Sequence, residues 1–550
     1  NMKRLTYLPA MFLFGMFLAL SACQDAAPGK HTDDIPFTYS EKYRPQFHFT
    51  PKANWMGAPG GLVYGNGRWH LFYEHNPWGD TPGNHSWGHA VTRDLIGWAH
   101  EPIAMYATGK GADSTLILPG SALLDRGNRA KICPDGTQKC LVAFYTSDVQ
   151  KKGETTAQYQ SMAYSTDDGM TWTPYAENPI VDLGNKSFRD PKVFWHTPSR
   201  QWVMVVASPP EHKVIFYGSK DLKAWEKLSE FSGIGDLSKE WERPDLFELK
   251  VMNEPGVSKW ILMVSGGNEH TATFGVQYFI GQFDGQKFTL DPDQTGSHYL
   301  DHGKDFYAAS TWNNDPYDRT LMIGSMNNPE YADKMPTGPW AGTQSLVRRL
   351  VMFRSETDST YKVYQVPIRE LENYRGTYGG YTDLKLPCEP RLFEKIRFTS
   401  GEIQAVLAPY GTLPSDDFGV KVFVSKDDKG NIVEETIVGY NMLNEFLYID
   451  RSRSGIVDLN DGYPERVQVP IKLKDGKIII HIFIDESTVE VFANNGEAVL
   501  STRVFPTMHQ GGIELFAHAP GRAVAEQYNC WEYKSTWEQI GLKKAENTTE

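Results

Sequence analysis

The feature that most constrains this fold is a repeated pattern of strands and turns from about residue 36 to residue 354. Each unit ends in a turn that joins an aspartate to an aromatic residue, at 92–98, 165–172 and 219–225, with a weaker copy at 283–288. Between the turns lie five apolar runs, which we expect to be inner strands: 69–73, 141–146, 202–207, 260–265 and 321–325. Five such units predict a five-bladed β-propeller, whereas a β-sandwich would give shorter and more even spacing.

A propeller places the starts of its innermost strands around one central funnel. Polar residues from successive blades can therefore share one pocket although they lie far apart in the chain. We accordingly expect residues 36–365 to form the propeller and to contain any active site.

Beyond residue 384 the pattern changes to alternating polar and apolar positions, which is typical of half-buried strands. The run 477–484 alternates in this way, and the Asn-Asn-Gly sequence at 494–496 is a strong hairpin turn. We expect a β-sandwich over 385–540, joined to the propeller by a linker of helical character at 366–384. The predicted fold class is all-β: a five-bladed β-propeller followed by a C-terminal β-sandwich.

The charge balance excludes some partners. The formal net charge is −13, from 55 Lys and Arg against 68 Asp and Glu, which argues against binding to a nucleic-acid backbone. Basic residues are scattered, so no polybasic patch marks a membrane-binding surface. The 15 histidines show no paired metal spacing, and no glycine-rich loop has the context of a nucleotide site. We therefore expect no metal, no cofactor and no nucleic-acid partner.

The N-terminal segment has the pattern of an export signal. A basic start precedes an apolar run at 7–20, which is too short to span a bilayer comfortably. Its end, the Leu-Ser-Ala-Cys sequence at 20–23, resembles a bacterial lipobox, in which Cys23 is lipidated; the alternative is a chance cysteine. We expect a signal peptide at 1–23 and a tether at 24–35. The protein would be a cell-envelope lipoprotein, outer-membrane or periplasmic, attached to the membrane through its lipid anchor alone.

Two cysteines flank a predicted turn. Cys133 and Cys140 enclose a Pro-Asp-Gly sequence that could bring them together. In an oxidising envelope they could form a disulfide, and two free thiols are the alternative. The sequence leaves both open.

A stretch near the start of the propeller carries a family signature. Residues 54–61 read Asn-Trp-Met-Gly-Ala-Pro-Gly-Gly. This stretch resembles the Trp-Met-Asn-Asp-Pro-Asn-Gly motif that opens the catalytic domain of glycoside hydrolase family 32, the β-fructosidases. Further matches follow in the family's order, at 71–77, 87–90, 188–191, 241–247 and 301–308. The stretches 485–492 and 503–506 resemble its C-terminal sandwich signature, and we expect their acidic residues to be solvated.

The resemblance implies a retaining mechanism with two carboxyl groups roughly 5–5.5 Å apart. Glu242 matches the family's acid/base, Asp190 its transition-state stabiliser, and Arg189 the partner of Asp190 in the same subsite. The plainer alternative is a turn ion pair beside a strand-end glutamate. Motif positions imply sugar contacts for five further residues: Trp55, Glu74, Asp301, Lys304 and Trp340.

The family's nucleophile is missing. Ala58 stands at its position, and a methyl group cannot form a covalent intermediate. Such a loss typically costs several orders of magnitude in rate. Glu74 stands where the family usually has Gln. Its carboxylate could replace the nucleophile, could activate a water molecule, or could only bind a sugar hydroxyl. Other departures surround the sugar site: Gly57, Pro82, 118–121 and Ala341.

Two functions from different classes follow. The first is a glycoside hydrolase acting on β-fructofuranosides such as levan, inulin, fructo-oligosaccharides or sucrose. The second is a catalytically silent fructan-binding protein on the same scaffold. A third interpretation, an inverting propeller glycosidase of arabinose polymers, fits the predicted fold but gains no support from the second domain.

Overall fold

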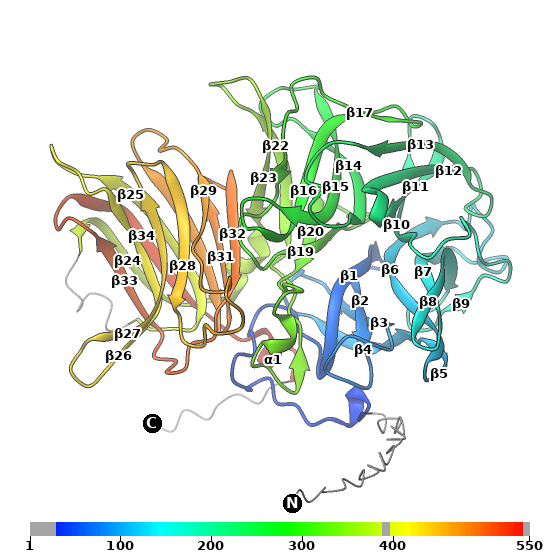
Figure 1. Ribbon diagram of the computed structural model, residues 1–550, viewed down its shortest axis with the longest axis horizontal. Coiled ribbons are helices and arrows are strands. Elements are labelled where there is room, and N and C mark those ends of the chain that lie inside the picture. The colour runs from blue at the N-terminus through cyan, green and yellow to red at the C-terminus, as the bar shows by residue number, and fades with distance from the viewer. Residues whose placement is uncertain (1–28, 388–395, 543–550) are drawn as a thin grey trace, which may run out of the picture.

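The computed structural model describes residues 29–387 and 396–542, which form two β-rich domains that lie side by side (Figure 1). Cys23 and the predicted signal peptide lie outside these residues. The predicted tether ends earlier than expected, because the short helix η1 (Thr32–Asp34) packs on the propeller. The Thr32 amide donates to the Pro77 carbonyl at 2.8 Å. Among the described residues, no helix is long and apolar enough to cross a membrane.

Five sheets form the blades of the propeller, which confirms the predicted architecture (Figure 1). Blade 1 contains β1 (Asn54–Gly65), β2 (Arg68–Asn76), β3 (Ser86–Thr92), β4 (Ala99–Met105) and the returning β21 (Trp340–Ala341). Blade 2 contains β5 (Thr108–Lys110), β6 (Asp113–Arg126), β7 (Lys139–Lys151), β8 (Glu154–Ser165) and β9 (Thr173–Pro174). Blade 3 contains β10 (Arg189–His196), β11 (Gln201–Ser208), β12 (Lys213–Ser219) and β13 (Glu226–Ser232).

The last two blades complete the ring. Blade 4 contains β14 (Glu242–Lys250), β15 (Ser258–Asn268), β16 (Thr273–Phe283), β17 (Phe288–Leu290) and β18 (His298–Tyr299). Blade 5 contains β19 (Tyr307–Thr311), β20 (Thr320–Ser325), β22 (Arg348–Arg354) and β23 (Tyr361–Pro367). Two short helices lie in connections: η2 (Pro209–Glu211) and η3 (Ala332–Lys334).

The apolar runs hold a different place in the blades than expected. The innermost strands are β1, β6, β10, β14 and β19, and β19 closes the ring on β1. The apolar runs are the second strands: β2, β7, β11, β15 and β20. A second strand is hydrogen-bonded on both sides and covered by neighbouring blades on both faces, so apolar residues are favoured along its length. Every residue of β11, for example, is buried.

Each innermost strand carries a β-bulge near its start. The pairing shifts at 56/59 in β1, 118/120 in β6, 189/192 in β10, 242/245 in β14 and 307/310 in β19. A bulge inserts an extra residue and turns neighbouring side chains toward new directions. In three bulges a non-glycine residue is left-handed: Asp190 at φ 68°, Arg243 at φ 54° and Ala308 at φ 52°. Such backbone costs about 1–3 kcal/mol per residue and gathers at functional sites.

Two sheets form the C-terminal β-sandwich. The first, in spatial order, contains β24 (Arg375–Leu386), β34 (Ala523–Tyr533), β25 (Ser400–Pro409), β30 (Ile478–Asp485), β31 (Thr488–Ala493) and β32 (Ala498–Arg503). The second contains β29 (Val467–Pro470), β28 (Phe446–Arg453), β27 (Ile432–Asn441), β26 (Asp417–Lys426) and β33 (Gly512–Ala517). A short helix, α1 (Thr536–Gln539), follows them.

The linker between the domains is shorter than predicted. The helix η4 (Arg369–Tyr374) accounts for the helical character of this segment. The following strand β24 pairs with β34 along its length, so it already belongs to the sandwich.

Buried ionic groups join the two domains. His48 of the propeller side lies between two sandwich carboxylates, with Nδ1 2.8 Å from Asp485 Oδ2 and Nε2 2.8 Å from Glu490 Oε1. Arg348 of β22 donates to Glu490 Oε2 at 2.6 Å. Both carboxylates are fully buried, so the prediction that they are solvated is wrong. Strand alternation separates two faces but does not reveal which face meets another domain.

His48 makes the stability of this interface pH-dependent. Burial lowers the pKa of His48, but Asp485 and Glu490 outweigh burial and raise it to about 9. In the unfolded chain the pKa of the His48 ring is about 6.5. The contribution of His48 is therefore complete below that pH and is lost as pH rises through 9. We expect the free energy of unfolding, from urea titrations, to fall by about 3 kcal/mol over this interval.

Two variants check this assignment. His48→Gln should lack the slope, whereas the exposed His518→Gln should keep it. A His48→Gln slope equal to that of the unsubstituted protein would contradict the role of His48.

Cys133 and Cys140 form a disulfide, so the first alternative holds. The bond closes the connection between β6 and β7. Asn128 supports the same loop, because its side-chain amide donates to the Cys133 carbonyl at 2.7 Å. Cys530 in β34 is a buried free thiol.

Candidate active site

The funnel of the propeller holds a pocket of about 500 Å³. Every innermost strand contributes to its lining: Ala58 from β1, Pro119 from β6, Asp190 from β10, Glu242 from β14 and Tyr307 from β19. The bulged strand starts therefore converge as the propeller geometry predicts. Trp55, Glu74 and Arg189, which were expected to bind sugar, also line this pocket.

Neighbouring strands hold Glu242 in place. Arg189 donates from Nε and Nη2 to Glu242 Oε1 at 3.1 and 2.8 Å, and the Tyr307 hydroxyl donates to Oε2 at 2.6 Å. These three residues begin β10, β14 and β19, so the same strand position supplies each one. The Glu242 side chain remains 29% exposed. A carboxyl group that is fixed and open to the pocket can transfer a proton to a bound oxygen.

Asp190 follows Arg189 in β10 and is only 5% exposed. Its Oδ2 accepts a hydrogen bond from the Arg243 amide at 3.0 Å, and its own amide donates to Thr146 Oγ1 at 3.0 Å. Burial raises the pKa of Asp190 to about 6. Glu242 adds to the rise, and Arg243 and Arg189 oppose it. In its ionised form the carboxylate can accept hydrogen bonds from sugar hydroxyls.

Arg243 contacts the start of β1, the strand that lacks the nucleophile. Its Nη2 donates to the carbonyl of Pro59, the residue directly after Ala58. The guanidinium of Arg189, and not that of Arg243, is the cation hydrogen-bonded to Glu242. Arg243 thus connects the bulges of β14 and β1.

Gly57 and Ala58 have small side chains or none, and the Glu74 carboxylate occupies the space next to Gly57. A Cβ on Gly57 would lie 2.5 Å from Glu74 Oε2 and 2.5 Å from the Trp55 ring. With Trp55 and Glu74 in these positions, residue 57 cannot carry a side chain. The absence of the family's Asn at 57 and the presence of Glu74 are therefore linked.

Glu74 is a partly buried, ionised carboxylate beside Ala58. Its Oε2 accepts a hydrogen bond from the Ala58 amide at 3.4 Å, and its Oε1 lies 2.5 Å from His85 Nδ1. Burial raises the pKa of Glu74, but His85 and Arg243 outweigh burial and leave the pKa below its ordinary value. Burial lowers the pKa of His85, but the negative charges of Glu74 and Asp148 outweigh burial and raise this pKa above its ordinary value. His85 thus fixes Glu74, whose side chain lines the pocket.

Asp301 and Lys304 do not lie in the pocket, which corrects their prediction as sugar ligands. The Asp301 carboxylate is 1% exposed and accepts hydrogen bonds from Arg348 Nη1 at 3.0 Å and Ser501 Oγ at 2.6 Å. Lys304 Nζ donates to Glu465 Oε2 at 2.9 Å. Both residues anchor the sandwich, because the loop that carries them runs along the domain interface.

Trp340, which the motif match predicts to contact sugar, does not line the pocket either. Its ring is fully buried, and the Arg44 guanidinium lies 3.9 Å from the ring centroid. The next two residues, Ala341 and Gly342, line the pocket instead. Trp340 supports the wall without facing the sugar site.

We expect Asp301→Asn to destabilise the protein without changing sugar affinity. Removing one partner of a buried ion pair typically costs about 3–5 kcal/mol. Urea unfolding should show this loss, and calorimetry should show unchanged binding to fructo-oligosaccharides. Asp318→Asn, which removes an exposed partner of Lys250, is the control and should leave stability unchanged. A selective loss of sugar affinity in Asp301→Asn would restore the original prediction.

Three residues of the site were not identified as site residues from the sequence: Tyr307, His85 and Arg243. Tyr307 begins the fifth innermost strand, so its register relative to Arg189 and Glu242 could have revealed it. His85 lies in the connection before β3 and carries no local signal. Its role depends on Glu74, which reaches it from another strand.

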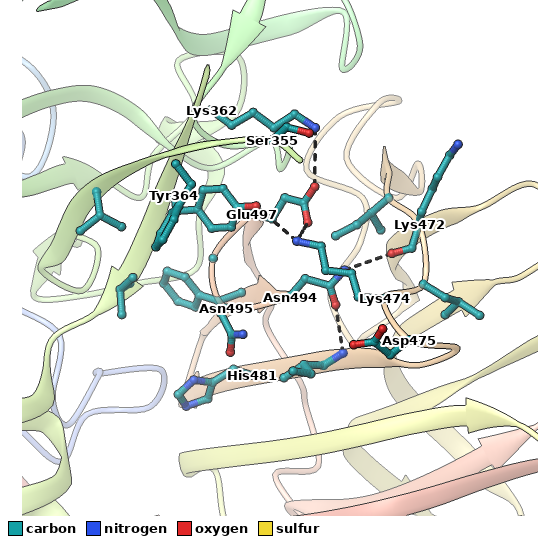
Figure 2. Close-up of a pocket in the computed structure, with 18 of the residues that line it drawn as sticks. Ser355, Lys362, Tyr364, Lys472, Lys474, Asp475, His481, Asn494, Asn495 and Glu497 are labelled. Carbon is teal, nitrogen blue, oxygen red and sulfur yellow. Dashed lines mark hydrogen bonds and ion pairs between the residues drawn. The ribbon is translucent and has the colours of Figure 1, made fainter. Parts of the chain in front are cut away.

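A larger hollow, about 1420 Å³, lies between blade 5 and the sandwich (Figure 2). Two of its lysines pair with one glutamate: Lys474 Nζ lies 2.5 Å from Glu497 Oε2, and Lys362 Nζ lies 3.8 Å from Oε1 (Figure 2). Asn494 donates to the Lys472 carbonyl at 3.1 Å. We place the chemistry in the funnel, where Glu242 and Asp190 face one pocket.

A five-bladed propeller with carboxyl groups at its funnel, followed by a β-sandwich, defines a glycosidase class. The chain belongs to glycosyl hydrolases family 32: the N-terminal domain of that family matches residues 48–367, and its C-terminal domain matches residues 396–532. The family resemblance drawn from the motifs is thereby confirmed.

Known relatives share most of their length with this chain. Levanase of Bacillus subtilis (strain 168) is 38% identical over 543 residues, which cover 97% of this chain and 76% of that protein. Extracellular exo-inulinase of Aspergillus awamori is 34% identical over 534 residues, which cover 91% and 96% respectively.

Solved structures agree with the fold. The crystal structure of the Aspergillus awamori exo-inulinase has a TM-score of 0.82 at 32% identity and covers 91% of this chain and 100% of that chain. An aspartate-to-alanine mutant of a Bombyx mori β-fructofuranosidase, in complex with sucrose, has a TM-score of 0.67 at 26% identity. It covers 90% of this chain and 94% of that chain.

Proposed function

We propose that this protein cleaves β-fructofuranosidic bonds in levan, inulin, fructo-oligosaccharides or sucrose, with Glu242 as the acid and Asp190 as the transition-state stabiliser. The meeting of Arg189, Glu242 and Tyr307 on successive innermost strands, directly beside Asp190, carries this proposal. The names of the relatives, levanase and exo-inulinase, support the substrate class.

The contacts suggest how the bond breaks. Glu242 gives a proton to the glycosidic oxygen while the bond from that oxygen to the fructosyl carbon breaks. Arg189 and Tyr307 then stabilise the newly ionised carboxylate by hydrogen bonds. Asp190 accepts hydrogen bonds from the fructosyl hydroxyls and balances the positive charge that develops on the ring.

A second candidate is a fructan-binding protein without turnover. Ala58 favours it, because no carboxylate extends from the nucleophile position. The pocket would still bind a fructosyl unit through Asp190, Arg189 and Trp55.

One pair of measurements separates the two candidates. Reducing-sugar release from levan and inulin is followed beside calorimetric binding to the same polymers. Release together with binding supports the enzyme, and binding without release supports the binding protein. A protein that neither binds nor cleaves these polymers would contradict both candidates.

We also propose that the protein is a cell-envelope lipoprotein anchored through Cys23 and that it meets fructans at the outer-membrane surface or in the periplasm. The lipobox-like sequence supports the anchor, and similarity to the extracellular exo-inulinase of Aspergillus awamori supports export. Labelled palmitate should enter the expressed protein and not its Cys23→Ala variant. Equal labelling of both would overturn the anchor.

A further inference from the structure

We propose that Glu74, positioned by His85, acts as the general base for a water molecule in place of the missing nucleophile, so that hydrolysis inverts the configuration of the fructosyl carbon. This inference rests on the proposed function, because it requires a fructoside in the pocket with Glu242 as its acid. It assigns a catalytic residue, a positioning residue and a stereochemical outcome.

The bulge of β1 places Glu74 directly opposite the vacant position. Met56 pairs with His75, and Pro59 pairs with Tyr73, so Gly57 and Ala58 together face Glu74 on β2. The Ala58 amide donates to Glu74 Oε2 at 3.4 Å. Glu74 and Ala58 both line the pocket that Glu242 faces from another blade. On this side of the pocket the carboxylate therefore extends from the second strand β2, whereas the family's nucleophile position lies on the innermost strand β1.

The change of strand affects the distance between the two carboxyl groups. Glu74 extends from β2, the strand behind β1, and neighbouring strands lie about 4.8 Å apart. Its Oε1 is held by His85, and its Oε2 reaches the Ala58 amide without passing in front of β1. Retaining glycosidases keep their carboxyl groups about 5–5.5 Å apart, and inverting ones about 6.5–9.5 Å apart. We expect the wider spacing for Glu74 and Glu242, because the base starts from the second strand.

The site also provides space and charge for the water. Ala58 has only a methyl group where the family's nucleophile carries a carboxylate, so a water molecule can lie between Glu74 and the sugar. His85 Nδ1 fixes Glu74 Oε1, and the Trp55 ring meets the His85 ring edge to face at 5.2 Å. His85 and Arg243 keep the pKa of Glu74 below its ordinary value despite burial, so the base is ionised at neutral pH.

The proposed reaction balances with water as the only co-reactant. The water oxygen bonds to the fructosyl carbon on the face opposite the leaving oxygen, and Glu74 takes one water proton. The bond to the leaving oxygen breaks as Glu242 donates its proton there. Glu74 ends protonated and Glu242 ionised, and solvent exchange restores both. No covalent intermediate with the protein forms.

Methanol tests the stereochemistry in the unsubstituted protein. A retaining enzyme can pass its covalent fructosyl group to methanol, whereas a water-directed inverting enzyme has no such intermediate. With 1-kestose in aqueous methanol, we expect sugar release without methyl β-fructofuranoside. Early NMR spectra should show α-fructofuranose as the first product. Formation of methyl β-fructofuranoside would overturn the proposal.

Variants test the two residues. Glu74→Gln should lower kcat by about 100-fold or more, with calorimetric binding of 1-kestose within a few-fold. Glu226→Gln, on the exposed start of β13, is the charge-matched control and should keep full activity. An unchanged kcat in a folded Glu74→Gln protein would overturn the role of Glu74.

His85 is a positioning residue, and its test is the pH profile. Without the His85 charge, Glu74 should lose its proton only at higher pH, so His85→Ala should move the acidic limb of kcat upward. His85→Gln, which can still donate to Glu74, should recover part of kcat. A profile that keeps its acidic limb in both variants would contradict this role.

The outcomes separate this inference from the proposed function. If the protein neither binds nor cleaves fructosides, the proposed function fails. If it cleaves with retention, the proposed function stands and this inference fails. If it binds without cleaving, the inference fails and the binding protein remains.

Discussion

Glu242→Gln is expected to lower kcat on fructo-oligosaccharides by about 10²- to 10⁴-fold, the usual contribution of a general acid. Glutamine keeps the size of the side chain, and its carbonyl oxygen can still accept from Arg189 or Tyr307. It cannot give up a proton to the leaving oxygen. Binding should therefore persist while turnover is lost.

The nature of the leaving group distinguishes a lost acid from a damaged pocket. Fructosyl fluoride needs no proton to depart, so Glu242→Gln should cleave it at a rate close to that of the unsubstituted protein. Initial rates on 1-kestose and on fructosyl fluoride, measured in parallel, give the ratio. An equal loss on both substrates would show that Glu242 is not the acid.

The double variant Ala58→Asp/Glu74→Gln is expected to make methyl β-fructofuranoside in methanol and to exceed Glu74→Gln in kcat by several orders of magnitude. It returns a carboxylate to the innermost strand, at the spacing that a nucleophile requires. Product analysis by NMR and initial rates of fructose release measure the effect.

Ala58→Asp alone should gain much less than the double variant. Its new carboxylate would lie beside that of Glu74, whose Oε2 is 3.4 Å from the Ala58 amide. Two adjacent carboxylates do not both ionise easily, so one would hold a proton. The four proteins form a double-mutant cycle, and a strong coupling between positions 58 and 74 is expected. Additive effects would indicate that the two positions act independently.

The unusual residues around the sugar site depend on one another in the structure. Read along the chain, Gly57, Ala58 and Glu74 are separate departures from the family motif. In the folded chain they form one arrangement, because Glu74 Oε2 occupies the space that a side chain at residue 57 would need. The other departures, Pro82 and Ala341, also line the same pocket.

The predicted architecture agreed with the structure where the signal was local. Turns of Asp and Trp recur at 92–98, 165–172 and 219–225, and alternation changes at the sandwich. Domain ends were less accurate, because β24 was assigned to the linker. An edge strand is recognised by its partner β34, which lies far away in the sequence.

The structure brings some of the predicted site residues together in the funnel and places others at the domain interface. Glu242, Asp190 and Arg189, which the family motifs indicated, lie at the starts of innermost strands and line one pocket. Asp301 and Lys304 follow the motif order equally well, yet they face the sandwich. Motif order records position along the chain, and only packing shows which side of a loop meets solvent, sugar or another domain.

Short-range patterns were therefore sufficient for the propeller and the sandwich, since periodicity and turn chemistry act between neighbouring residues. Short motifs were sufficient for the family. The partnership of Glu74 with Ala58 and His85 emerges only in the folded chain. It depends on the bulge that sets two residues of β1 against one residue of β2, and on a loop that brings His85 to the same place. Register and loop position are long-range properties, because hydrogen bonds between strands determine them.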